Sequence, residues 1–236
     1  MKRLLLATAL TAAPFLWGPA AHATLQLEYS LDGGVTFTTL CTAPSGTQCA
    51  NLSTTTSNGI ELTITGSHSN SPGVSLLADL FSSAVDITNT SGTTESIQIR
   101  AGDQGYMAPS APATLESGIG GSITIPGAGN LLSYQSCVDG TNALDACPGT
   151  VATPFVTPGI TGPAGGSYNA NNTAAVLSLG HPFSMTEQLN ITLSAGSAFN
   201  YSASSELVPN VPEPASLAIL GVSLLGLGMV RRFRRS

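Results

Sequence analysis

The sequence predicts an all-β protein, an antiparallel β-sandwich over residues 24–208, with a cleaved signal peptide before it and a single transmembrane helix after it. Apolar residues alternate with polar ones at a period of two, and Gly, Pro and Asn turns separate the alternating runs. No apolar stripe with the helical period of about 3.6 residues occurs between the two termini. Short alternating strands joined by such turns are typical of a sandwich with one face of each strand in the core.

The N-terminus has the three parts of a secretory signal peptide. Met1-Lys2-Arg3 is positively charged, residues 4–17 are apolar and broken by Pro14, and Ala21-His22-Ala23 supplies the small residues of a cleavage site. We therefore expect export, with signal peptidase cutting after Ala23 and residues 1–23 removed.

The strands can be followed along the exported part. The run at 25–31 alternates and ends in the Asp32-Gly33-Gly34 turn, after which a returning strand begins at 35–37. The other alternating runs lie at 60–65, 85–87, 97–101, 123–125, 189–193 and 199–203. The stretch 148–172 is rich in Pro and Gly and predicts a long loop, with strands resuming at Ala174. A linker is expected at 208–211.

Four cysteines remain after signal removal, in two local pairs: Cys41 with Cys49, and Cys137 with Cys147. An exported chain meets an oxidising compartment, so disulfides are expected. Three pairings are possible, and the turn-rich segments inside each pair favour the local one. Each closure would stabilise the fold by about 3 kcal/mol in the chain-entropy model.

The exported part is strongly acidic. Residues 24–211 hold 12 acidic residues and one basic residue, Arg100, which gives a formal charge of 1 − 12 = −11. Nucleic-acid binding needs clustered cations, so the composition excludes a nucleic-acid partner.

Catalytic patterns are absent from the sequence. There is no G-x-S-x-G, and no lysine follows Lys2 to act as a nucleophile or base. His68 lies in a polar loop and His181 in a turn. The carboxylates that could pair for glycoside hydrolysis either alternate outward on strands or have no motif around them: Glu28, Glu61, Glu116 and Glu187. We therefore predict no enzyme and no cofactor.

One acidic loop is a candidate for a hard cation such as calcium. Asp139, Asn142 and Asp145 lie inside the Cys137–Cys147 segment and could present oxygen ligands. The spacing lacks a dense calcium-loop pattern, and Asp and Asn are also ordinary turn residues. We therefore predict no metal site. If an ion is bound, these three residues are the candidate ligands.

The last 28 residues, 209–236, form a three-part tail. Pro212, Glu213 and Pro214 precede an uncharged apolar segment, Ala215 to Val230, which would be about 24 Å long as a helix. A basic end follows, containing Arg231, Arg232, Arg234 and Arg235. Arginines held on the cytoplasmic side would stop such a segment in the membrane. From these features alone, the tail can be an ordinary C-terminal membrane anchor.

The tail resembles the PEP-CTERM sorting signal of Gram-negative bacteria in its motif, its glycine-interrupted apolar run and its arginine block. The resemblance covers about the last 25 residues and implies recognition by an exosortase, a membrane protease-transpeptidase, with removal of the tail near the motif. In such proteins the tail is read and does no catalysis.

The sequence thus predicts an exported, surface-displayed or secreted structural protein of the extracellular matrix. The alternative is a carbohydrate-binding module of an exopolysaccharide matrix, with Tyr106, Tyr134 and Tyr168 as candidate stacking platforms. A third hypothesis is a hydrolase with an unrecognised carboxylate pair.

Overall fold

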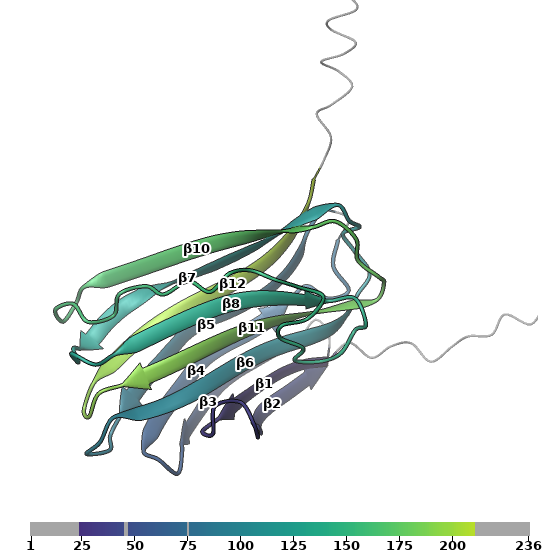
Figure 1. The fold of residues 1–236 in the computed structure, drawn as a ribbon. Coiled ribbons are helices and arrows are strands. Elements are labelled where there is room, and N and C mark those ends of the chain that lie inside the picture. The colour runs from purple at the N-terminus through teal and green to yellow at the C-terminus, as the bar shows by residue number, and fades with distance from the viewer. Residues whose placement is uncertain (1–23, 45–46, 75, 211–236) are drawn as a thin grey trace, which may run out of the picture.

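The computed structural model describes residues 24–44, 47–74 and 76–210, and it confirms the antiparallel β-sandwich (Figure 1). These residues form twelve strands and no helix: β1 (Thr24–Ser30), β2 (Thr38–Pro44), β3 (Gln48–Thr55), β4 (Ile60–Ser69), β5 (Ala78–Asn89), β6 (Glu95–Tyr106), β7 (Ala113–Ile125), β8 (Leu131–Asp139), β9 (Val151–Ala152), β10 (Ser167–Val176), β11 (Phe183–Leu193) and β12 (Ala198–Pro209). The predicted signal peptide, 1–23, and the predicted membrane helix, 215–230, lie outside the described residues. Within the described ranges, no helix is long and apolar enough to span a bilayer.

The strands form two six-stranded sheets. Sheet A has the order β2-β1-β6-β11-β8-β9, and sheet B has the order β10-β7-β12-β5-β4-β3. All neighbouring strands in both sheets are antiparallel. Many neighbours are distant in sequence, so the chain crosses between the sheets repeatedly and the centre of each sheet is built from several regions of the sequence.

Inward-facing apolar side chains form two clusters between the sheets. One contains Ile60, Ile99, Leu189 and Phe199, and the other contains Leu80, Leu115, Phe183 and Leu207. On β11, the inward residue between the two clusters is Glu187, which is fully buried. Inward serines occupy the equivalent places on the neighbouring strands: Ser82, Ser117, Ser136 and Ser205. A polar layer therefore crosses the middle of the core.

Both predicted disulfides are present. Cys41 and Cys49 have Cα atoms 6.0 Å apart, and Cys137 and Cys147 have Cα atoms 5.5 Å apart. The first joins β2 of sheet A to β3 of sheet B at one side of the sandwich. The second ties the loop after β8 back to that strand.

Some elements differ from the sequence prediction. Strand β10 begins at Ser167, inside the stretch that was expected to be a loop. The strand was not recognised there because its inward positions hold Ala and Asn as well as Tyr168, so no apolar alternation marks it. Strand β12 continues to Pro209, and Asn210 N–H donates to Pro112 O at 3.0 Å, so these residues are not a linker. Strands β3 and β8 lacked a clear alternating run and were not predicted. The returning strand expected from residues 35–37 is β2, which begins at Thr38 and pairs with β1.

Candidate functional site

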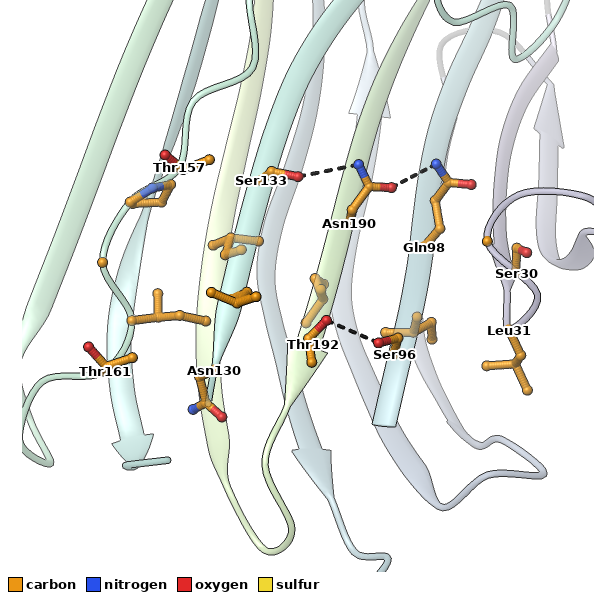
Figure 2. A pocket seen from close by; sticks show the side chains of 18 residues that line it. Ser30, Leu31, Ser96, Gln98, Asn130, Ser133, Thr157, Thr161, Asn190 and Thr192 are labelled. Carbon is orange, nitrogen blue, oxygen red and sulfur yellow. Dashed lines mark hydrogen bonds between the residues drawn. The ribbon is translucent and has the colours of Figure 1, made fainter. Parts of the chain in front are cut away.

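A groove of about 680 Å³ crosses the outer face of sheet A (Figure 2). It runs from the 157–161 segment over β8, β11 and β6 to the end of β1 and the loop that follows. The groove-facing residues of each strand alternate with core residues: Gln98 follows Ile97, Ser133 follows Leu132, and Asn190 precedes Ile191. The alternation that builds the core therefore also places polar side chains on the outer face.

A chain of hydrogen bonds lies along this groove. Strand register sets Ser30, Gln98, Asn190 and Ser133 side by side on four adjacent strands. Gln98 Nε2 donates to Asn190 Oδ1 at 2.8 Å, and Asn190 Nδ2 donates to Ser133 Oγ at 3.3 Å, as Figure 2 shows. Each amide nitrogen has a second N–H, and the Ser133 hydroxyl still has its proton to donate. The chain can therefore bind a ligand while its internal bonds stay intact.

A second, parallel row continues the polar surface. The hydroxyls of Ser96 and Thr192 lie 3.0 Å apart. Leu131, 66 % exposed, adds apolar surface beside them in the register of Thr192. None of the 18 lining residues, all of them described, carries a charge or an aromatic ring. The groove is thus neutral, rich in amides and hydroxyls, and partly apolar.

The loop after β1 closes one end of the groove. Asp32 accepts hydrogen bonds from the Ser30 hydroxyl and from the hydroxyl and N–H of Thr36. These bonds hold the loop in shape and lower the pKa of Asp32. Gly34, at φ 92°, lies against Gln98, and a side chain at position 34 would collide with Gln98 Oε1. That oxygen is buried and has no hydrogen-bond partner among the described protein atoms. It is a buried acceptor behind the groove, covered by Gly34.

The loop closed by the second disulfide covers the next part of the same face. Its Asp145 lies over Gly102 of β6, where a side chain would collide with the Asp145 carboxylate. Arg100 lies next to this region on β6, 4.2 Å from its guanidinium carbon to the centre of the Phe37 ring. Burial and, to a smaller extent, the negative charge of Glu28 raise the pKa of Asp145, Arg100 opposes both, and the pKa that results is about 7. The single cation of the domain is therefore shared between two carboxylates beside the groove.

The three candidate metal ligands in this loop have separate partners. Asp139 accepts hydrogen bonds from Thr141, Ala143 N–H and Thr150. Asn142 Oδ1 accepts from Gly105 N–H at 2.8 Å, and Asp145 faces Gly102. Among the residues with described positions, no group of three or more His, Cys, Asp or Glu side chains could hold a metal ion.

Asp145→Asn is expected to stabilise the protein above pH 7, and Asp139→Asn to destabilise it. The raised pKa of Asp145 means that its stabilising form is the protonated one, which is lost as pH rises through about 7. Burial raises the pKa of Asp139, but hydrogen bonds from Thr141, Ala143 and Thr150 outweigh it and lower that pKa overall, so its ionised form stabilises. Thermal unfolding at pH 5.5 and 8.5 checks both. If both variants changed the unfolding temperature at pH 8.5 by the same amount and in the same direction, the opposite pKa shifts of Asp145 and Asp139 would be contradicted.

The other predicted site residues do not meet at a site. Tyr106, Tyr134 and Tyr168 are all buried, so the prediction that they are exposed stacking platforms is wrong. Their hydroxyls donate inside the fold, for example Tyr168 to Asn200 O at 2.7 Å. His68 lies on β4 and not in a loop, 5.3 Å from the Phe81 ring, and His181 lies in the predicted turn. Glu61 and Glu116 are exposed, whereas Glu28 is buried and Glu187 fully so.

The groove residues were not found from the sequence. Gln98, Ser133 and Asn190 are ordinary polar positions on alternating strands and lie up to 92 residues apart. Only the register of β6, β11 and β8 brings them together. The one signal in the sequence was the run of amide and hydroxyl residues at outward positions, which also occurs in strands that line no groove.

Known structures resemble this chain only weakly. TmCBM61 in complex with beta-1,4-galactotriose is 10 % identical, with 52 % of this chain and 68 % of that chain covered and a TM-score of 0.33. A carbohydrate-binding module of the beta-sandwich super family is 7 % identical, with 75 % and 82 % covered and a TM-score of 0.28. The enzymatically active domain of bacteriophage CBA120 tailspike protein 4 is 10 % identical, with 61 % of this chain and 19 % of that chain covered and a TM-score of 0.29. Scores this low carry no conclusion about ligand or activity.

The C-terminal tail gives the specific match. No curated protein matches the chain. Residues 210–235, however, match the family described as the PEP-CTERM protein-sorting motif. This range contains the Pro212-Glu213-Pro214 motif, the apolar segment and the arginines on which the sequence resemblance was based. The chain is therefore an exported protein that carries a PEP-CTERM sorting motif.

Proposed function

We propose that the domain of residues 24–210 is a non-catalytic component of the extracellular matrix, displayed or released after processing, and that its sheet A groove binds a neutral polysaccharide. The observation that carries the proposal is the uncharged amide and hydroxyl chain of Gln98, Asn190 and Ser133. Sugar hydroxyls both accept and donate hydrogen bonds, so they can accept from the second N–H of each amide and from the Ser133 hydroxyl.

Charge favours a neutral polymer over an acidic one. The formal charge of 1 − 12 = −11 over residues 24–211 repels uronic acids and sulfated sugars at long range. Arg100 does not compensate within the groove, because Phe37 covers its guanidinium and Glu28 and Asp145 lie around it. Leu131 and the aliphatic parts of the amide side chains supply the apolar contacts for C–H groups of the sugar.

Asn190→Ala is expected to weaken polysaccharide binding about tenfold or more. Asn190 is the middle member of the chain, so its loss removes one ligand contact and also leaves Gln98 and Ser133 without their shared partner. Each lost hydrogen bond contributes about 1 kcal/mol, and about 1.4 kcal/mol corresponds to a factor of ten in affinity. A glycan array identifies the neutral ligand, and titration calorimetry with that ligand measures the change.

Asn169→Ala is the matched control, because Asn169 is an exposed asparagine on β10 of the opposite sheet. It should bind like the wild type. Unchanged binding by Asn190→Ala would show that the polysaccharide does not bind in the sheet A groove. Tighter binding to uronic acid polymers than to neutral ones would contradict the ligand class, and an array without any binder would contradict carbohydrate binding itself.

A further inference from the structure

The four edge strands of the sandwich are not equally protected against pairing with another chain. Proteins commonly blunt sheet edges with short strands, prolines, bulges or covering groups. In sheet A, β9 has only two residues and β2 ends at Pro44. In sheet B, β3 skips its pairing at Asn51, which has φ 55°, and it is joined through Cys49 to the other sheet. Each of these three edges carries at least one such device.

The fourth edge, β10, has none of these devices. It pairs with β7 over all ten residues, Ser167 to Val176, without a register shift. Its sequence, SYNANNTAAV, holds no proline and no charge. Figure 1 shows β10 as the outermost strand of sheet B, and no described segment pairs with its free side. It is therefore a long, regular strand edge with backbone groups that lack ladder partners.

The outward backbone groups can be identified. Thr173 N–H donates to the side chain of Asn172 at 2.9 Å, so this N–H points away from β7. In a regular antiparallel strand, alternate residues share one direction. The groups on the free edge therefore belong to five alternate residues: Ser167, Asn169, Asn171, Thr173 and Ala175. All five are exposed, small or polar, and uncharged.

We propose that this edge pairs with the β10 edge of a second copy of the chain, antiparallel and about a two-fold axis at Asn171. In that register Asn171 faces its own counterpart, Asn169 faces Thr173, and Ser167 faces Ala175. Each copy offers five C=O groups and four N–H groups along the shared edge, and the fifth N–H, that of Thr173, pairs with the second copy only if it leaves the Asn172 side chain. A contact in which both copies use the same surface closes as a symmetric dimer and joins two B sheets into one.

The argument for a second copy as the occupant is the match between the two edges, because the second copy presents the same ten-residue strand with the same uncharged outward side chains. Two domains, each with a formal charge of −11, repel each other over most of their surfaces, and an uncharged edge is where they can approach. The nearest acidic residue on the adjoining strand is Glu116, opposite Thr173. In the dimer the two Glu116 residues are separated by three strand spacings, about 14 Å across the strands, and by a further four residues, about 14 Å, along them, which is well beyond the screening length of roughly 8 Å.

This dimer does not rest on polysaccharide binding, because β10 belongs to sheet B and the groove to sheet A. The two properties combine if both hold. A dimer joined through sheet B leaves both grooves open, and two linked grooves bind one polymer with higher avidity than either alone.

Cysteine cross-linking in the full, exported chain tests the register directly. Directly opposed residues of an antiparallel pair have Cα atoms about 5.5 Å apart, within the range of a disulfide. Asn171→Cys should therefore yield mainly disulfide-linked dimer in the oxidising compartment, seen on a non-reducing gel. Asn169→Cys alone should stay monomeric, because the two copies of residue 169 are about 14 Å apart along the strands. Asn169→Cys combined with Thr173→Cys should restore the dimer.

A fourth variant tests the backbone bonds. Asn171→Pro removes an outward N–H and no bond to β7, so adding it to the Asn169→Cys, Thr173→Cys background should abolish the dimer while peptide mapping still finds the two native disulfides. Cross-linking of Asn169→Cys as strong as that of Asn171→Cys would mean random collision and would overturn the proposal. The absence of dimer with both Asn171→Cys and the double variant would overturn it as well.

Discussion

Glu187→Gln is expected to stabilise the sandwich at pH 9 by several kcal/mol, and to leave it almost unchanged at pH 4. Glu187 is fully buried between the two apolar clusters. Burial raises its pKa, hydrogen bonds from Ser82, Tyr134 and Ser205 offset part of that rise, and the pKa that results is about 8. The Ser82 hydroxyl donates to Oε2 at 2.7 Å and the Tyr134 hydroxyl to Oε1 at 3.3 Å. The folded protein therefore holds this carboxyl in its neutral form at neutral pH.

The sign follows from proton binding. Between the unfolded pKa of 4.5 and the folded pKa of about 8, the folded state keeps a proton that the unfolded state has lost. The free energy of unfolding then falls as pH rises, by about 1.4 kcal/mol per pH unit, to a total of about 5 kcal/mol. Glutamine has nearly the same size as glutamate and stays neutral at every pH. In the variant, the free energy of unfolding should therefore no longer fall by the roughly 1.4 kcal/mol per pH unit that Glu187 contributes.

Chemical denaturation of residues 24–210 at pH 4, 6, 8 and 9 measures the effect. Glu61→Gln is the control, since Glu61 is an exposed glutamate on β4 and its replacement should leave the slope as in the wild type. Asp145, Glu28 and Asp103 also have raised pKa values through burial, so a weaker slope should persist in Glu187→Gln. An unchanged slope in Glu187→Gln would show that Glu187 is not the buried neutral acid.

Glu213→Ala is expected to leave export intact and to block C-terminal processing. An exosortase reads the Pro212-Glu213-Pro214 motif, so the variant should keep the apolar segment and its arginines and stay in the inner membrane. An ordinary anchor depends on the apolarity of residues 215–230 and on the arginines after them, and the same change would then have no effect. If an exosortase processes the protein, the wild type is lighter than Glu213→Ala by the mass of the removed tail. If the tail is an ordinary anchor, both proteins keep it.

Intact-mass spectrometry in the native host measures that difference. Glu206→Ala is a suitable control, because it removes an acidic residue from β12, seven positions before Glu213 and inside the fold. It should be processed like the wild type. Wild-type protein at the cell surface that still ends at Ser236 would contradict exosortase processing, and with it the main reason for placing the protein in the matrix.

Local patterns predicted the parts of this protein that depend on neighbours in sequence. Alternation at 25–31, 60–65 and 189–193 predicted strands that the structure contains, and the short spacing of each cysteine pair predicted the pairing. The first part of strand β10, residues 167–173, was missed because β10 is an edge strand with one side open. It packs with small residues such as Ala170 and Ala174, and its sequence resembles a polar loop.

The sequence by itself determined the sandwich class, the two disulfides and the sorting motif, because a strand period, a short loop closure and a linear motif are all properties of neighbouring residues. Only the tertiary structure decided which polar side chains are buried and which meet. Glu187 and Ser82 are 105 residues apart, and Gln98 and Asn190 are 92 apart. Strand register and the packing of the two sheets bring these pairs together, and a period of two in the sequence cannot specify which strands become neighbours.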